Sequence, residues 1–301
     1  MLDLVFAARP MLHLPIWSIF LVSLFYHHQL SNESFRWSDA GMMACLSLLA
    51  AGAYYFNQIY DRSTDRINRK LGFLQEGCFT ENELMVSYLI VSLLAIGCAL
   101  LYSVFILIVF LQLFVLGYIY SASPLRLKDR PIFGILANGY AFGFLVPFTV
   151  MPDLTFDNAG LLGWDNPIYF FLAVASIYLL TTLPDREGDR ATGKRTVAVI
   201  LTPWLVKLLA VLLMLLAAFI AGRTHRDLLA LLALVSALPT IASLFIFSQK
   251  IILLAAKLPI LLLTLLAGYF YPLYLACIIL RLIFSRLYYK RRFNLMYPRL
   301  A

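Results

Sequence analysis

The chain alternates between long apolar runs and short polar stretches along its whole length. Nine apolar segments can be read, near residues 10–28, 38–60, 83–101, 104–122, 131–151, 166–184, 200–221, 228–247 and 254–283. A helix needs about 20 apolar residues to cross a bilayer core. The pattern therefore predicts an all-α membrane protein with about nine transmembrane helices. The third and fourth segments are hard to separate, because the sequence from 84 to 118 is almost continuously apolar.

The composition supports a membrane location. Hydrophobic residues make up 62% of the 301 residues, and charged residues make up 13%, whereas an ordinary soluble domain carries about 25% charged residues. No polar stretch is long enough for a separate soluble domain. We therefore expect an integral, multi-pass membrane protein whose single domain covers residues 1–301.

The distribution of basic residues predicts how the chain is oriented. The net charge is +8, and most Lys and Arg residues lie in short loops or in the last twenty residues. This pattern fits the positive-inside rule better than nucleic acid binding, so we expect membrane lipids and no nucleic acid as partners. The basic loops after segments two, four and six share one face, which we expect to be cytoplasmic. Nine spans place the basic tail on the opposite face, which the rule does not predict.

Two acidic motifs follow apolar segments two and six. Asn57, Asp61 and Asp65 recur at intervals of four, so a helix that continues through them carries all three on one face, in a stripe about 12 Å long. Asp185 and Asp189 form a shorter stripe. Facing carboxylates repel one another unless a cation lies between them, and Mg²⁺ prefers such oxygen ligands together with phosphate oxygens. The motifs therefore suggest a site for divalent metal and a polyanion such as a diphosphate.

A simpler interpretation is that these acids pair with neighbouring arginines at the membrane surface. Two motifs at equivalent places make that interpretation weaker, because ionisable groups near a membrane are costly and usually functional. Asp61 and Asp185 lie 124 residues apart, each after an even-numbered segment. The spacing suggests two related four-helix halves, near 10–130 and 131–250, followed by a ninth helix and a basic tail over 251–301.

At these residues the chain resembles the UbiA-type superfamily of intramembrane prenyltransferases. That family carries an N-x-x-x-D-x-x-x-D motif after the second helix and a D-x-x-x-D motif after the sixth, and YSASPLRLK and EGDRATGKRT also resemble its sequences. Arg9-Pro10 resembles the family's usual start of the first helix. The resemblance implies that Asp61, Asp65, Asp185 and Asp189 are catalytic and bind Mg²⁺. It further implies that the diphosphate is bound by Asn57, Arg69, Lys70, Tyr120, Arg126 and Lys128.

The resemblance also implies a nine-helix bundle around a central cavity and a Mg²⁺-dependent reaction. In that reaction a prenyl group passes from an isoprenyl diphosphate to an acceptor within the membrane, such as an aromatic quinone precursor or another lipid-pathway acceptor. This sequence departs from the family's pattern in two places, and both bear on the identity of the acceptor. The sequence NRKLGFLQEG lacks the prolines of aromatic prenyltransferases, and Thr182 stands where many members carry an acid. The sequence does not choose between a phenol, a naphthoate, a glycerol phosphate lipid and a sugar phosphate.

Two other functions use intramembrane acids. A CDP-alcohol phosphotransferase has one contiguous acidic stretch, whereas the acids here are split. A cation-coupled transporter places its acids near the bilayer midplane, whereas these acids lie at segment ends.

Three further kinds of polar or aromatic residue have expected roles. Asn138 is expected to form a hydrogen bond between helices or to line an acceptor pocket, and Arg281 is expected to snorkel to the interface. Tyr118 or Tyr178 could stabilise an allylic cation.

Overall fold

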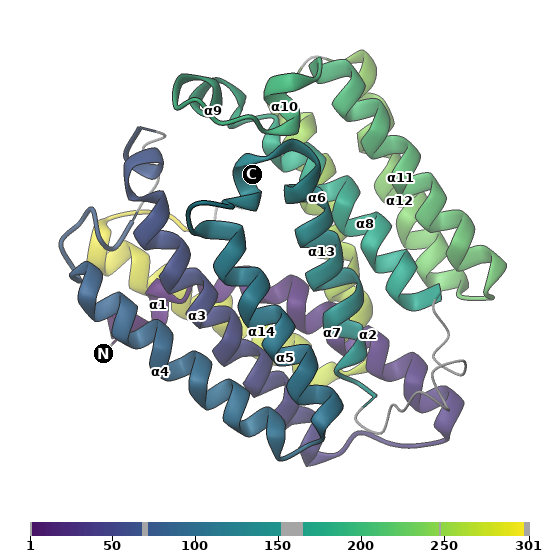
Figure 1. The fold of residues 1–301 in the computed structure, drawn as a ribbon. Helices are drawn as coiled ribbons and strands as arrows, with labels where there is room; N and C mark the ends of the chain where they lie inside the picture. The colour runs from purple at the N-terminus through teal and green to yellow at the C-terminus, as the bar shows by residue number, and fades with distance from the viewer. Residues whose placement is uncertain (1, 68–71, 152–164, 247, 298–301) are drawn as a thin grey trace.

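The computed structural model describes residues 2–67, 72–151, 165–246 and 248–297. Within these ranges the chain is almost entirely helical and contains no strand, which confirms the predicted all-α class (Figure 1). In chain order the elements are α1 (Leu2–Ala7), η1 (Pro10–His13), α2 (Leu14–Ser31), α3 (Trp37–Ile67), α4 (Glu81–Leu100), α5 (Val104–Ser121), η2 (Leu127–Asp129), α6 (Pro131–Tyr140), η3 (Ala141–Leu145), α7 (Val146–Phe148), α8 (Asp165–Thr182), α9 (Arg186–Ala191), α10 (Val197–Ile200), α11 (Pro203–Arg223), α12 (Asp227–Phe245), α13 (Gln249–Phe270) and α14 (Pro272–Phe293).

Nine helices in the described ranges are long and apolar enough to cross a membrane, which confirms the predicted number. Their identities differ from the prediction in two places. The predicted span at 166–184 forms α8, whose apolar part is shorter than the other nine. The predicted single span at 254–283 is wrong, because α13 and α14 replace it.

The chain breaks between α13 and α14 at Tyr271 and Pro272. Tyr271 leaves the helical conformation, with φ −131° and ψ 84°, and Pro272 occupies the first position of α14. A proline cannot donate the backbone hydrogen bond that would continue α13, but it suits the start of a helix. A comparable signal separates α4 from α5, where the Ser103 hydroxyl accepts a hydrogen bond from the Ile106 N–H at 3.2 Å and caps α5.

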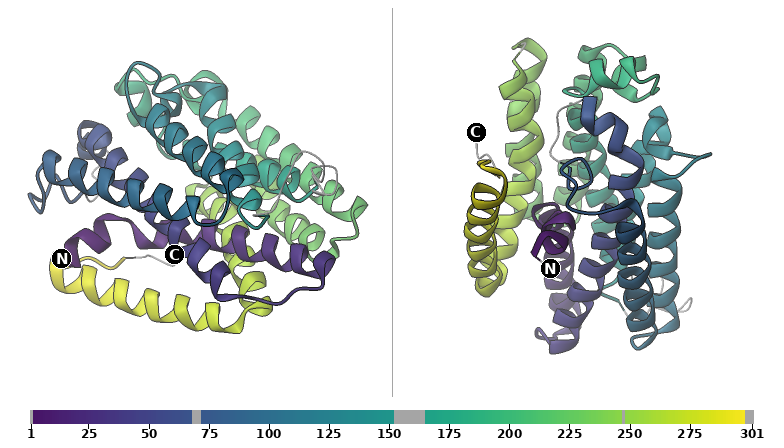
Figure 2. Two further views of the ribbon diagram at one scale, coloured as in Figure 1. Left: turned by 60° about the horizontal axis from the view of Figure 1, so that its bottom comes forward. Right: turned by 90° about the vertical axis from the view of Figure 1, so that its left-hand side faces the viewer.

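Helix α14 brings the C-terminal end of the chain back to the face that bears the acidic motifs, which we call the motif face. The Tyr288 ring stacks on Phe6 with centroids 3.7 Å apart, and Phe293 packs edge-on against Phe73 at 5.5 Å. Figure 2 shows the end of α14 beside the N-terminus. The described part of the tail, residues 294–297, therefore follows a helix that ends at the motif face. The described tail lies on the side of the motif face because two helices, α13 and α14, stand where one last span was predicted.

The bundle packs most closely around α8. Tyr169, Phe170, Leu179 and Leu180 of this helix are almost completely buried, and α11, α13 and η3 pack against it. The Ser176 hydroxyl donates to the Ala210 carbonyl of α11 at 2.7 Å. Many fully buried positions on the surrounding helices are alanines, and small residues allow membrane helices to approach closely. Helices α2, α3, α5 and α6 enclose a cavity beside this packed region.

Candidate active site

The first acidic motif lies on an unbroken helix. Helix α3 continues through Ile67, so Asn57, Asp61 and Asp65 share one face as the spacing predicts. The Lys128 amine of η2 donates to the Asp61 carboxylate at 2.6 Å and to the Asn57 side-chain oxygen at 2.9 Å. The Ser121 hydroxyl donates to the same Asn57 oxygen at 2.9 Å. Burial lowers the pKa of the Lys128 amine, and the Asp61 carboxylate opposes that shift.

The third residue of this motif contacts the start of the chain. The Arg9 guanidinium lies 3.3 Å from a carboxylate oxygen of Asp65, which is buried. Arg9 has a left-handed backbone with φ 51°, and a non-glycine residue in such a conformation is strained. Sequence reasoning missed this role of Arg9, because a contact across 56 residues has no local signal.

The second acidic motif lies on a broken helix. Helix α8 ends at Thr182, and Asp185 precedes the short helix α9. The Asp189 N–H donates to the Asp185 carbonyl at 2.8 Å, so the two acids are one helical turn apart. The Asp189 carboxylate accepts a hydrogen bond from the Thr196 hydroxyl at 3.2 Å and lies 3.7 Å from the Lys194 amine.

The short helix η2 joins the two motifs. Its Lys128 contacts Asp61, and the next residue, Asp129, lies 3.6 Å from the Lys194 amine that also faces Asp189. The Asp129 carbonyl accepts the Arg195 N–H at 3.1 Å. A continuous polar connection therefore runs from the first motif through η2 to the second.

Several predicted diphosphate ligands have other partners. The Arg126 guanidinium lies 2.9 Å from the Asp129 carboxylate. The Tyr120 hydroxyl accepts a hydrogen bond from the Asn138 amide at 3.2 Å. Arg69 and Lys70 lie outside the described residues. Thr182, which replaces the expected acid, is buried and donates to the Leu179 carbonyl at 2.7 Å.

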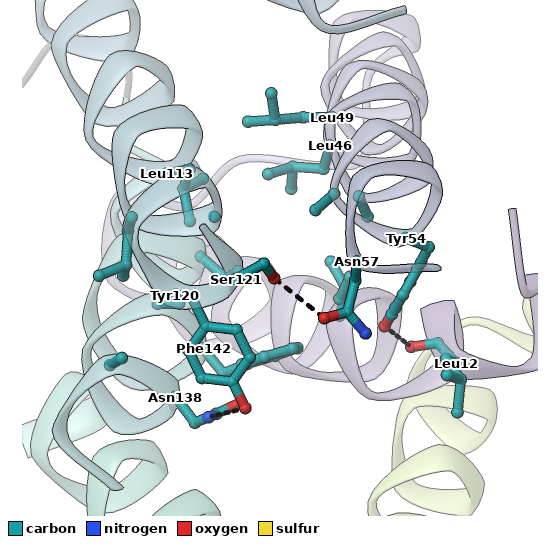
Figure 3. Close-up of a pocket in the computed structure, with 18 of the residues that line it drawn as sticks. Leu12, Leu46, Leu49, Tyr54, Asn57, Leu113, Tyr120, Ser121, Asn138 and Phe142 are labelled. Atoms are coloured by element: carbon teal, nitrogen blue, oxygen red, sulfur yellow. Dashed lines mark hydrogen bonds between the residues drawn. The ribbon is translucent and has the colours of Figure 1, made fainter. Parts of the chain in front are cut away.

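The first motif begins beside an apolar cavity of about 330 Å³, which Asn57 lines. Figure 3 shows Tyr54, Asn57 and Tyr120 at one end of this cavity. Ten of its apolar lining residues are Leu12, Ile16, Leu46, Leu49, Ala53, Leu113, Leu116, Ala137, Phe142 and Val146. Because Asn57 both lines the cavity and contacts Lys128, the polar end of the cavity meets the first motif.

The donor set fits Mg²⁺, although the acids are dispersed. In the described part of the chain no three His, Cys, Asp or Glu side chains are placed to hold one metal ion. Asp61, Asp65 and Asp189 instead face Lys128, Arg9 and Lys194. The motifs nevertheless offer carboxylate oxygens and one amide oxygen, which are the ligands that Mg²⁺ prefers. Each carboxylate is partly or fully buried, and such a charge requires a neighbouring cation.

Comparisons with known proteins agree with this architecture. The model of the UbiA prenyltransferase family matches residues 16–251. The homogentisate solanesyltransferase of Arabidopsis thaliana is 30% identical over 176 residues, covering 54% of this chain and 45% of that protein. The chlorophyll synthase of Oryza sativa subsp. japonica is 29% identical over 162 residues, covering 48% of this chain and 39% of that protein. The chain thus matches less than half the length of these curated relatives.

The fold is also similar to that of a solved membrane protein. The structure of a UbiA homologue from Archaeoglobus fulgidus, bound to DMAPP and Mg²⁺, matches with a TM-score of 0.63 at 17% identity. The match covers 88% of this chain and 97% of that chain. At this identity the likeness concerns the fold. Helix α14 lies beyond the residues that match the family model.

Proposed function

The chain belongs to the UbiA prenyltransferase family, and on this basis we propose that it transfers a prenyl group from an isoprenyl diphosphate to an acceptor within the membrane. One observation carries the proposal. An apolar cavity ends at Asn57, and the side chain of Asn57 shares the Lys128 amine with Asp61. The apolar cavity can therefore hold an apolar chain, and the adjacent polar cluster can bind a polyanionic leaving group.

We assign the diphosphate to the space between α3 and α9. Mg²⁺ held by Asp61, Asp65, Asp185 and Asp189 would neutralise the leaving group when bound, as metals do at departing oxygens. The Mg²⁺-bound relative from Archaeoglobus fulgidus supports this assignment. Lys128, which already lies between two motif residues, is placed to donate to a diphosphate oxygen. Arg9 and Lys194 bring further positive charge beside Asp65 and Asp189.

The prenyl chain is assigned to the apolar cavity. Breaking the bond between C1 and oxygen leaves the electron pair on the diphosphate and an allylic cation on the chain. The acceptor then supplies an electron pair to C1 and loses a proton. The apolar lining excludes water, which would otherwise capture the cation. Tyr54 and Tyr120 lie at the polar end of the cavity, where their ring faces can stabilise positive charge.

The proposal extends to the membrane orientation. In the described residues, the basic loops after α5 and α8 lie at the motif face, and α14 carries Arg286, Lys290, Arg291 and Arg292 toward the same face. This distribution supports a cytoplasmic motif face. The named relatives act on different acceptors, since one is a homogentisate transferase and the other a chlorophyll synthase. The proposal therefore concerns the donor and the transfer, and the acceptor is assigned by experiment.

Diphosphate release tests the proposal directly. Purified protein in detergent would be incubated with DMAPP, geranyl diphosphate or longer prenyl diphosphates, with and without Mg²⁺ and candidate acceptors. We expect release that requires Mg²⁺ and stops on chelation. Parallel incubation with CDP-alcohols tests the phosphotransferase alternative. Metal-independent release, or no turnover with any donor and acceptor, would contradict the proposal.

A further inference from the structure

A groove of about 590 Å³ lies on the motif face, separate from the apolar cavity. One wall is formed by η2 and the start of α6, and the other by the turn after α9 and by α10. Its lining residues are Asp129, Arg130, Pro131, Ile132, Phe133, Thr192, Gly193, Lys194, Arg195 and Ile200. From its charge and its position we propose that this groove binds the headgroup of an anionic phospholipid of the surrounding bilayer.

Two arginines in the groove carry uncompensated charge. Arg130 and Arg195 are both exposed, and neither forms an ion pair with a carboxylate among the described residues. The Arg195 N–H donates to the carbonyl of Asp129, the residue before Arg130, so both arginines flank one point of contact between the walls. Guanidinium groups bind phosphate oxygens through paired hydrogen bonds.

The acid in the groove does not cancel these charges. The Asp129 carboxylate lies 2.9 Å from the Arg126 guanidinium and 3.6 Å from the Lys194 amine. Two cations thus neutralise one carboxylate within the wall. Arg130 donates one hydrogen bond to the Pro124 carbonyl at 3.3 Å. Its charge and its other N–H groups, together with those of Arg195, are available to a ligand.

The apolar side of the groove faces the acyl region of a membrane. Helix α6 begins a membrane-spanning segment at Pro131, which places Arg130 at the level of the headgroups. Ile132 and Phe133 follow directly and are 62% and 51% exposed, and Ile200 across the groove is 48% exposed. A ligand with a negative head and apolar chains matches this order of charge and apolar surface.

A second groove on the same face provides a contrast. It has a volume of about 740 Å³ and lies between the end of α3 and the start of α4. Its Arg62 is paired with Glu81 at 2.8 Å, and Glu83 also lines it. This groove has no such excess of positive charge, so it does not suit an anionic headgroup.

Native mass spectrometry of the full chain tests the proposal. The detergent-purified protein would be titrated with phosphatidylglycerol and, separately, with phosphatidylcholine. We expect wild-type protein to retain one phosphatidylglycerol in preference to phosphatidylcholine. The double variant Arg130→Gln/Arg195→Gln should bind phosphatidylglycerol roughly 30-fold more weakly, since each basic residue near an anionic surface contributes about fivefold.

Two further variants make the test decisive. Arg286→Gln/Lys290→Gln removes the same charge from exposed positions of α14 toward the same membrane face, and it should change the affinity less than about twofold, because neither residue lines the groove. Arg130→Lys/Arg195→Lys keeps the charge but loses the paired hydrogen bonds, so it should bind more tightly than the glutamine variant and more weakly than wild type. Equal wild-type affinity for the two lipids, or equal losses in the two glutamine variants, would overturn the proposal. The readout is lipid binding, so the result is independent of prenyl transfer.

Discussion

The two acidic motifs carry similar side chains on different backbones. The first lies on α3, which continues to Ile67 without a break. The second is divided, since α8 ends at Thr182 and α9 begins after Asp185. The local sequence explains the difference. The stretch from Asn57 to Ile67 contains no proline or glycine, whereas Pro184 disfavours helix at the preceding residue.

The surroundings of the two motifs differ in the same way. The first motif is fixed to the start of the chain, because the Gln58 amide donates to the Ala7 carbonyl at 2.7 Å and Arg9 pairs with Asp65. The second is fixed to its own following turn through Lys194 and Thr196, and this turn needs Gly193 at φ 73°. A continuous helix and a segment with a helix break thus face each other across η2.

The largest expected effect is on turnover, and it should be the same for both motifs. Asp61→Asn and Asp189→Asn each remove a carboxylate assigned to the metal and diphosphate. We expect each to lower the rate of diphosphate release by at least about 10²–10³-fold, as removal of one electrostatic contact to a transition state does. Asp227→Asn, at the start of α12, is the control. Wild-type rates in either motif variant would refute the assignment.

Proline substitution should separate the continuous helix from the jointed one. Ile59→Pro interrupts α3 between Asn57 and Asp61, removes a helical hydrogen bond and costs about 3 kcal/mol or more. Glu187→Pro places the ring in the first turn of α9, where backbone N–H groups have no helical partner. We expect a large drop in the thermal unfolding midpoint for Ile59→Pro and a small one for Glu187→Pro. Similar drops would contradict the contrast.

The cations beside the motifs should differ in their effect on stability. Lys128→Met removes a buried amine 2.6 Å from Asp61 and leaves an unpaired, partly buried carboxylate, which costs about 3 kcal/mol. Lys194→Met removes an amine 3.6 and 3.7 Å from its two acids, too far for a hydrogen bond. Asp189 keeps the Thr196 hydroxyl and Asp129 keeps Arg126, so we expect a smaller loss of about 1 kcal/mol. Unfolding in detergent measures both, and a larger loss for Lys194→Met would reverse the predicted order.

The smallest effect concerns the attachment of the chain start beside the first motif. The hydrogen bond from Tyr288, aided by Arg292, lowers the pKa of Asp3. A carboxyl with a lowered pKa stabilises the fold above its unfolded pKa and loses that contribution as the pH falls through the folded value. At pH 6 the thermal unfolding midpoint of wild type should therefore be slightly higher than that of Asp3→Asn. The difference between the two midpoints should disappear as the pH falls below about 4. A gap that persists at low pH would exclude this cause.

Much of the site was predictable because its signals are local. The spacing of Asn57, Asp61 and Asp65 predicts one helical face, and α3 carries them on one face. The resemblance to the family made Lys128 a candidate diphosphate ligand, and the structure places its amine 2.6 Å from Asp61. By contrast, the boundary at Pro272 was missed, because apolar residues on both sides favoured one span over 254–283.

The remainder depends on contacts between distant parts of the chain. Arg9 reaches Asp65 across 56 residues, and Tyr288 reaches Asp3 across 285 residues. Neither contact has a periodicity or spacing to reveal it. Arg126 was expected to bind the diphosphate, but its guanidinium pairs with the carboxylate of Asp129, three residues away. Packing of the whole bundle decides such choices.

Binding of an unreactive prenyl diphosphate analogue tests the central claim most directly. Calorimetric titration with geranyl thiodiphosphate would compare wild type, Asp61→Asn and Asp189→Asn, each with Mg²⁺ and with chelator. If both motifs hold one diphosphate through Mg²⁺, wild type binds only with the metal and each variant loses binding. Metal-independent binding, or unchanged binding in one variant, would show that the two motifs do not form a single site.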